Sequence, residues 1–287
     1  MKRIGVIFHT DRPLIKEVTK KIVDWAGLND IEVCLSVELA DRVGFAKVIL
    51  PADDIWKCSD VILTLGGDGS MLASARAFGK HGIPILGINL GKLGFLTEVT
   101  QNQIEDTLIR LKNDNYLIEE RMALEASIPG FDATMPALND VVVDHGNSIR
   151  LVKTDLFCNG EFVCSYDADG VIISTPTGST AYSLSVGGPI INPLMEAIEV
   201  SPVSPHTLTL RTIIFPANSV LTIRAEPTEV NLRAALDGII VAELSAGEEI
   251  IVKKANYKIK FIKFEKSSFY EVLRTKLHWG ARPLFNS

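Results

Sequence analysis

The sequence predicts an α/β N-terminal domain with a parallel sheet, followed by an all-β, sandwich-like C-terminal domain. Two observations carry this prediction. Strands and helices alternate through the first hundred residues, and from Tyr116 onward the chain changes to short, Val- and Ile-rich segments of alternating polarity. The 287 residues, 47% hydrophobic and 22% charged, suffice for a folded core in one or two domains.

The N-terminal elements follow from hydrophobic periodicity. Short apolar runs bounded by turn residues predict parallel strands, and apolar residues at helical spacing predict the helices between them. Parallel strands joined by helices bind ligands beyond their carboxyl ends. The expected strands are 3–8, 31–35, 61–65 and 83–88, and the expected helices are 14–25, 70–80 and 101–112.

The C-terminal elements are predicted from turn signals between short alternating runs. We expect a domain over 1–115, a sandwich-like domain over 116–266, and a helix over 269–279, within a final segment 267–287 that returns to the first domain. The expected strands are 117–128, 148–157, 162–165, 170–174, 208–210, 213–215, 219–225, 230–236, 239–241, 249–254 and 257–264.

A glycine-rich turn follows the expected strand at 61–65. Gly66, Gly67 and Gly69 leave the backbone open to a ligand, and amides at the start of the next helix favour anions. Asp68 interrupts this anion site. It could cap the helix, but Ser70 could do so as well, which leaves a catalytic carboxylate as an equal alternative. No Lys follows the glycines as it would in a P-loop.

A second polar stretch runs from Asp169 to Tyr182 and continues into Gly187-Gly-Pro189. Its apolar strand breaks into residues 174–180, which are all Ser, Thr, Gly or Pro. Such a loop either caps the following helix or forms hydrogen bonds to a nucleotide or sugar.

Two acidic turns and two basic residues are further candidates. Asn139-Asp140 precedes an apolar run and reads first as a turn, and Asp237-Gly238 predicts a type I′ hairpin. Either pair could instead present a carboxylate to a ligand hydroxyl. Lys92 and Arg211 are candidate phosphate contacts, although single basic residues on loops are usually only solvated.

Composition excludes several classes of protein. The net charge of −6 argues against a general nucleic-acid or anionic-membrane binder. We expect no membrane span, because no apolar run approaches the ~18 residues required. Four cysteines without C-x-x-C spacing indicate reduced thiols rather than a zinc site, and hence a cytoplasmic protein.

Together these motifs resemble NAD kinases over essentially the whole chain. The resemblance rests on Gly66-Gly-Asp-Gly69, Gly91-Lys-Leu-Gly-Phe-Leu96, Asn139-Asp140, and the 169–189 block, with the closing Leu277-His-Trp279. It implies phosphoryl transfer from ATP or polyphosphate to the 2′-hydroxyl of the adenosine ribose of NAD, giving NADP. It also implies a divalent ion, Mg²⁺ by preference, and a homodimer or homotetramer.

The resemblance assigns roles residue by residue. Asp68 matches the aspartate that faces the acceptor hydroxyl, and Gly66 and Gly67 match a phosphate-binding turn. The remaining matched positions would bind NAD: Gly69, Phe95, Asn139, Asp140, Asp167, Asp169, Thr177, Thr180, Ala181 and Tyr182.

This chain departs from the family pattern at two positions. Asp167 stands where many bacterial members have Arg, and Ile239 stands where many have Gln. The competing hypotheses are a lipid or sugar-phosphate kinase that shares the glycine turn, and a dinucleotide-binding regulator without catalysis.

Overall fold

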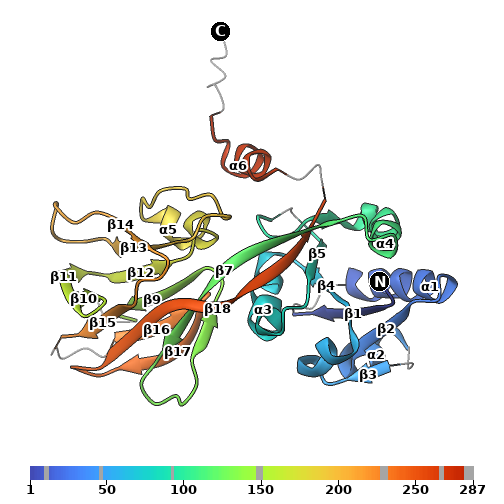
Figure 1. Ribbon diagram of the computed structural model, residues 1–287, viewed down its shortest axis with the longest axis horizontal. Helices are drawn as coiled ribbons and strands as arrows, with labels where there is room; N and C mark the ends of the chain where they lie inside the picture. Colours follow the sequence, from blue (N-terminus) through green and yellow to red (C-terminus); the bar gives the residue numbers. More distant parts are fainter. Residues whose placement is uncertain are drawn as a thin grey trace, which may run out of the picture. The chain divides into compact units, whose positions relative to one another are not determined.

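The structure is a computed structural model that describes residues 1–9, 13–44, 48–91, 94–146, 151–226, 232–264 and 268–280. The chain forms two compact units, Met1–Glu119 with Ile259–Ser287 and Glu120–Lys258. Strands β7 (Leu117–Ser127) and β18 (Glu249–Lys263) carry the chain from one unit to the other. In Figure 1 the colour sequence allows each unit to be followed separately.

The first unit is a parallel α/β structure, as predicted. Its strands lie in the order β3-β2-β1-β4-β5, every pair is parallel, and β18 joins β5 at Phe261. The strands are β1 (Arg3–Phe8), β2 (Glu32–Ser36), β3 (Val48–Leu50), β4 (Val61–Gly66), β5 (Ile85–Asn89) and β6 (Val99–Thr100).

Helices cover this sheet because alternate strand residues point to opposite faces. On one face, side chains such as Val6 and Leu63 form a core with helices α1 (Leu14–Leu28), α2 (Val37–Val43) and α4 (Ile104–Lys112). Helix α3 (Asp68–Phe78) packs on β4 and β5, where Gly87 leaves room for Met71.

The second unit consists of two antiparallel layers. The six-stranded sheet has the order β14-β13-β12-β9-β16-β17, and β11-β10-β15-β18, with β7 and β8, forms the other sheet. One apolar core contains side chains of both sheets, for example Val143 and Ile173 with Leu156 and Ile223. The sandwich-like prediction is therefore confirmed.

The strands of this unit are short except for β7, with which the chain enters the unit, and β18, with which it leaves. Besides β7 and β18 they are β8 (Met135–Ala137), β9 (Asp140–Asp144), β10 (Val152–Cys158), β11 (Glu161–Ala168), β12 (Gly170–Ser174), β13 (Ala197–Val203), β14 (Ile213–Pro216), β15 (Leu221–Ala225), β16 (Leu232–Leu236) and β17 (Ile239–Leu244). Short helical turns η4 (Gly178–Thr180) and α5 (Tyr182–Ser185) follow β12, and α6 (Phe269–Leu277) closes the chain.

Several elements differ from the prediction. Helix α2, strands β3, β9 and β13 and the 3-10 helix η1 (Ala52–Cys58) were not predicted, and residues 208–210, predicted as a strand, form a turn. Strand β18, predicted as two strands, is continuous. Strand β13 carries Glu199, Ser201 and Pro202, which do not resemble a central strand on pattern alone.

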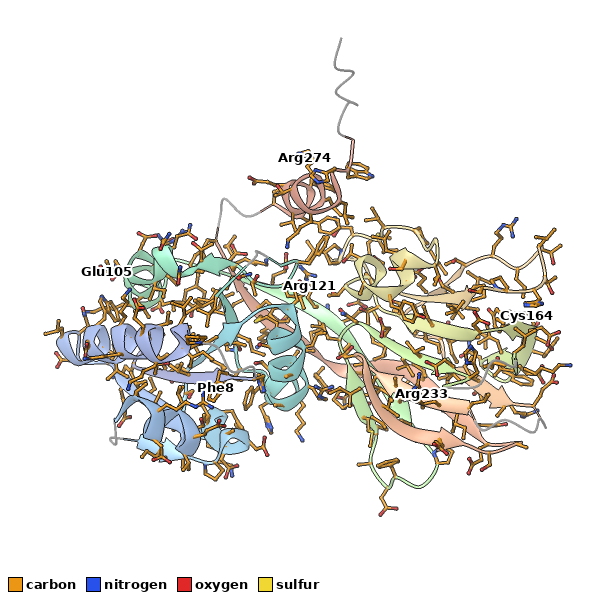
Figure 2. The ribbon with its side chains drawn as sticks, turned by 180° about the vertical axis from the view of Figure 1, so that it is seen from behind. Phe8, Glu105, Arg121, Cys164, Arg233 and Arg274 are labelled. Atoms are coloured by element: carbon orange, nitrogen blue, oxygen red, sulfur yellow. A yellow bond between two sulfur atoms is a disulfide. The ribbon has the colours of Figure 1, made fainter. Side chains whose placement is uncertain are left out.

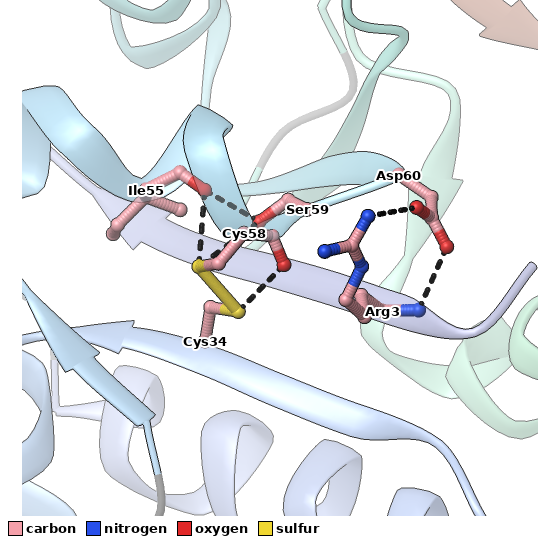
Figure 3. Close-up of a disulfide and its surroundings, with 6 residues drawn as sticks. All are labelled: Arg3, Cys34, Ile55, Cys58, Ser59 and Asp60. Carbon is pink, nitrogen blue, oxygen red and sulfur yellow. Dashed lines mark hydrogen bonds and ion pairs between the residues drawn. A yellow bond between two sulfur atoms is a disulfide. The ribbon is translucent and has the colours of Figure 1, made fainter.

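The cysteines also differ from expectation. Cys34 of β2 and Cys58 at the end of η1 are joined as a disulfide, with Cα atoms 6.6 Å apart (Figure 3). Cys158 and Cys164 are free. The sequence pattern did not predict this pair, because two cysteines 24 residues apart in sequence meet only in the folded sheet.

Candidate functional site

The glycine turn of the first unit ends a buried strand and begins a helix. Gly66 closes β4 with φ 149°, a backbone conformation that favours glycine, and Gly67 precedes the first residue of α3. A Cβ at Gly67 or Gly69 would meet nothing within 4 Å, so their backbone faces open space. The amides of Ser70 and Met71 donate to the Gly67 carbonyl at 3.0 and 3.1 Å, so the amides of residues 67–69 are the ones at this helix start that suit an anion.

Asp68 is fixed by the neighbouring turn and does not cap the helix. Its Oδ2 accepts the backbone N–H of Phe95 at 2.8 Å, and its Oδ1 accepts that of Leu96 at 3.0 Å. A Cβ on Gly94 would lie 1.8 Å from Asp68 Oδ1, so glycine is required there. The structure thus gives Asp68 a structural duty that sequence analysis missed, and it holds the carboxylate in one orientation.

The turn around Phe95 is organised by Asn89 and Thr97. Asn89, at the carboxyl end of β5, donates from Nδ2 to Thr97 Oγ1 at 2.9 Å and accepts the Gly91 N–H at 2.6 Å. The Gly94 N–H also donates to Thr97 Oγ1, at 2.9 Å. These bonds bring the predicted residues Asp68 and Phe95 together at the edge where parallel sheets bind ligands. Lys92 lies outside the described residues.

A cavity of about 560 Å³ lies in the same unit, beside the carboxyl ends of β1 and β2. Phe8 and His9 contribute from β1, and Phe8 pairs in register with Leu65, next to the glycine turn. Arg42 lies over the Phe8 ring, 4.8 Å from its centroid. Phe8 is labelled in Figure 2. The volume matches that of small-molecule pockets.

In the second unit, the structure brings Asn139-Asp140 together with the polar loop after β12. Asp140 pairs with Ser174 across the sheet, and the N–H of Thr175 donates to the Asn139 carbonyl at 2.8 Å. Gly178 packs so closely that a Cβ would lie 2.2 Å from the Asn139 oxygen. The two candidate stretches, 35 residues apart in sequence, therefore form one folded site.

Asp237 holds this site from a third segment. Its Oδ1 accepts the N–H of Asn139 at 2.7 Å and of Asp140 at 3.2 Å, and its Oδ2 accepts that of Leu138 at 2.9 Å. Asp237 and Gly238 have φ of 48° and 77°, which confirms the predicted type I′ hairpin. The carboxylate thus binds backbone amides of the Asn139-Asp140 turn.

The Asp140 carboxyl is almost fully buried, with 4% of the residue exposed. Burial, and then the negative charge of Asp237, raise the pKa of Asp140 to about 7. A carboxyl with this pKa can donate or accept a hydrogen bond at neutral pH, which suits contact with a sugar hydroxyl.

The remaining predicted residues of this unit differ in environment. Thr177 is buried and accepts from Nη1 of Arg121 at 3.2 Å, and Thr180 Oγ1 donates to the Thr177 carbonyl at 3.2 Å. Arg121, labelled in Figure 2, was missed in the sequence analysis, although it falls at a buried position of β7. Tyr182, which follows Ala181, is exposed to 44%.

The two aspartates near the end of β11 have basic neighbours. Asp169 Oδ1 lies 3.7 Å from His145 Nε2, and Asp167 Oδ1 lies 4.0 Å from Lys153 Nζ on the exposed surface. His145 was not predicted as a site residue. Arg211, a candidate phosphate contact, donates instead to carbonyl oxygens of its own loop at Leu208 and Leu210.

Among the described residues no group of three or more His, Cys, Asp or Glu side chains could hold a metal ion. A magnesium ion that accompanies a nucleotide needs only one or two carboxylates from the protein and takes its other ligands from phosphates and water. Asp68 suits such a role, because each of its oxygens keeps a lone pair beyond the amide it accepts. No helix in the described part of the chain is long and apolar enough to cross a membrane.

Both parts of the chain match models of one known protein family. Residues 4–116 match the ATP-NAD kinase N-terminal domain, and residues 138–264 match the ATP-NAD kinase C-terminal domain. An NAD kinase of Thermoanaerobacter sp. (strain X514) is 39% identical over 280 residues, covering 96% of this chain and 99% of that protein. An NAD kinase of Geobacter metallireducens is 37% identical, covering 98% and 100%.

Two solved structures share the fold. The yeast NADH kinase complexed with NADH has a TM-score of 0.92 and 26% identity, covering 100% of this chain and 90% of that chain. An NAD kinase from Archaeoglobus fulgidus in complex with ATP has a TM-score of 0.75 and 24% identity, covering 96% and 98%. Fold, site and relatives define a phosphotransferase that acts on an alcohol group. The chain belongs to the NAD kinase family.

Proposed function

We propose that this protein transfers the terminal phosphoryl group of ATP to the 2′-hydroxyl of the adenosine ribose of NAD, forming NADP. The observation that carries the proposal is the fixed Asp68 carboxylate, held by the amides of Phe95 and Leu96 beside the glycine turn. Family membership supports the same reaction.

In this mechanism Asp68 orients the acceptor hydroxyl and takes its proton. A positioned base typically contributes 10²–10⁴-fold to a rate. The amides at Gly67 and Gly69 would bind phosphate oxygens, since their backbone is open and lies at a helix start. Phosphoryl transfer depends mainly on alignment and charge neutralisation, which these groups supply.

A divalent ion, by preference Mg²⁺, would accompany the donor. When bound, it neutralises charge on the phosphate oxygens, and Asp68 is the residue of the first unit suited to contact it.

For NAD itself, we assign the ribose hydroxyls to Asn139 and Asp140. The Asp140 carboxyl, with its pKa near 7, can exchange hydrogen bonds with a diol. Thr177, Thr180, Ala181 and Tyr182 would surround the adenine, with Phe95 as an aromatic wall, and Asp169 would face the nicotinamide end. His145 beside Asp169 supplies a basic neighbour there. Asp167 stands at a position where many family members have Arg. This end of the site would therefore carry less positive charge than in those members.

The reaction is tested by offering NAD or NADH with ATP or polyphosphate in the presence of Mg²⁺. The proposal requires that the protein form NADP from NAD and ATP. Diacylglycerol and fructose 6-phosphate serve as control acceptors, and phosphorylation of either in place of NAD would contradict it. Binding of NAD without turnover would instead favour a non-catalytic regulator.

We further propose that the protein works as a homodimer or homotetramer. The two edge strands of the six-stranded sheet expose isoleucines, Ile213 and Ile214 on β14 and Ile239 and Ile240 on β17. Apolar side chains on sheet edges are typical of surfaces covered by another subunit. Light scattering of the purified protein measures its subunit number, and a monomer would contradict this assignment.

A further inference from the structure

Glu199 is a buried carboxyl that the proposed reaction does not use. It lies on β13, opposite Ser174 of β12, and neither its side chain nor its backbone reaches solvent. Burying a carboxyl group in a protein core is costly unless hydrogen bonds compensate. No sequence motif pointed to this residue, so its presence in an internal strand of the sheet requires an explanation.

The partners of Glu199 come from the segment that follows the polar loop. Ser183 Oγ and Ser201 Oγ both donate to Glu199 Oε1, the second at 2.9 Å, and Ser201 lies 2.9 Å from Thr212 Oγ1. Ser183 and Ser201 are completely buried. Glu199 Oε2 is buried without a hydrogen-bond partner in the described part of the chain. Burial raises the pKa of Glu199, although the two serines lower it in part.

The glycine pair at 187–188 is shaped around this cluster. A Cβ on Gly188 would lie 2.2 Å from both Glu199 Oε1 and Ser183 Oγ. The N–H groups of Val186 and Gly188 donate to the Ser183 carbonyl at 3.2 and 3.0 Å, and Gly187 has φ of 88°. Ser183 is therefore fixed through its side chain and its backbone.

Ser183 belongs to α5, a helix of only four residues that begins at Tyr182. So short a helix has little stability of its own and depends on tertiary contacts. Thr180, Ala181 and Tyr182, to which we assigned adenine recognition, directly precede Ser183. The bond to Glu199 connects this segment, in which Tyr182 is exposed, to strand β13.

We propose that Glu199 is a positioning residue for NAD recognition, which acts through Ser183 on residues 180–182. This inference rests on the function proposed above. Because Glu199 is fully buried, it would contact neither substrate. Its effect should therefore appear in the KM for NAD and leave the KM for ATP unchanged.

The test compares steady-state constants of the full-length wild-type protein with Ser183→Ala, Glu199→Val, the double variant and Glu199→Gln. Losing one buried hydrogen bond should raise the KM for NAD about tenfold in each of the first two variants. The KM for NAD of the double variant should rise by no more than about tenfold, because both substitutions remove the same hydrogen bond between Ser183 and Glu199. Glu199→Gln retains an oxygen acceptor and should stay within about threefold of wild type.

Glu196→Gln is the matched control. Glu196 lies three residues before Glu199 and forms ion pairs with Lys254 and Lys258 at the surface. The KM for NAD of the Glu196→Gln variant should therefore equal that of the wild type. If Glu199→Val does not fold, as thermal unfolding would show, Ser183→Ala and Glu199→Gln still decide the outcome.

An active wild-type protein whose Ser183→Ala variant keeps its KM for NAD would overturn this inference alone. The inference would also be overturned if the KM for NAD and the KM for ATP rose, and kcat fell, by the same factor. That pattern indicates general destabilisation. A wild-type protein that makes no NADP would instead overturn the proposed function.

Discussion

At the scale of single residues, several carboxylates of this protein accept backbone amides. Asp60 accepts the N–H groups of Lys2 and Arg3, Asp68 those of Phe95 and Leu96, and Asp237 those of the 138–140 turn. Each bond fixes a carboxylate and satisfies a donor at once. Substitutions at these positions separate the structural role of each carboxylate from a chemical one.

For Asp68, we predict that Asp68→Asn lowers kcat by roughly 10²–10⁴, the usual contribution of a positioned base. The amide would also place an N–H group against the N–H of Phe95 or Leu96, at a cost of about 1–3 kcal/mol in the free energy of unfolding. Steady-state kinetics and urea unfolding measure the two effects.

Asp60→Asn is the control for this comparison. Asp60 precedes β4 and accepts two amides at 2.8 and 2.9 Å, with Arg3 Nη2 3.2 Å from its Oδ1 (Figure 3). We expect a similar loss of stability with unchanged kcat. An Asp68→Asn variant that loses no more activity than Asp60→Asn would remove Asp68 from the chemistry.

Asp140 predicts a dependence of stability on pH. Its pKa rises on folding from 3.8 to about 7, so between these values the folded state binds a proton that the unfolded state lacks. The free energy of unfolding should therefore fall as pH rises through this range, by at most about 4 kcal/mol from this group. Urea unfolding at pH 5 and pH 8 measures the change.

Asp140→Asn should flatten this dependence and increase stability at pH 8, where the wild-type carboxyl is ionised and buried. An identical pH dependence in wild type and variant would contradict the assignment.

At the scale of secondary-structure elements, the second unit builds its site from loops that are held by a neighbouring hairpin. The β16–β17 hairpin places Asp237 against the turn before β9, and β9 in turn pairs with β12. Nearby, Arg233 of β16, labelled in Figure 2, donates from Nε and Nη2 to the two oxygens of Asp144 of β9, at 3.0 and 3.1 Å. The hairpin is thus linked to β9 near both ends.

This arrangement predicts the effect of Asp237→Ala. Three backbone donors of residues 138–140 would lose their acceptor, at a cost of about 1–3 kcal/mol for each group that stays buried. We expect the KM for NAD to rise at least tenfold and the thermal midpoint to fall. Arg233→Lys weakens the same hairpin at its other end, and we expect it to lower the thermal midpoint without the tenfold change in KM. Equal KM values for NAD in the two variants would contradict the role of Asp237.

Sequence patterns predicted the elements with regular periodicity and missed those that depend on tertiary contacts. Strands β1, β4 and β12 are continuous apolar runs, and their bounds agree with expectation to within a residue. Strand β13 was missed because its polar residues are buried by Ser183 and Thr212, which are distant in sequence. The bonds that hold Asp68 and Asp140 likewise come from residues 27 and 97 positions away.

At the scale of the whole molecule, each unit supplies a different part of the proposed reaction. The parallel unit holds the glycine turn and Asp68, which suit phosphate binding and proton transfer. The antiparallel unit holds Asp140 and the 174–182 loop, which suit recognition of a dinucleotide. The resemblance to NAD kinases predicts this division, whereas the hydrogen bonds made by Asp237 and Glu199 are visible only in the structure.

The most direct test of the account is the product formed by the purified protein from NAD, ATP and Mg²⁺. Phosphorus NMR identifies the position of the new phosphate, and an NADP-specific dehydrogenase measures its rate of formation. We expect NADP phosphorylated at the 2′-hydroxyl of the adenosine ribose, with the Asp60→Asn variant fully active and the Asp68→Asn variant at least a hundredfold slower. A wild-type protein that forms no NADP, or an Asp68→Asn variant as fast as wild type, would contradict it.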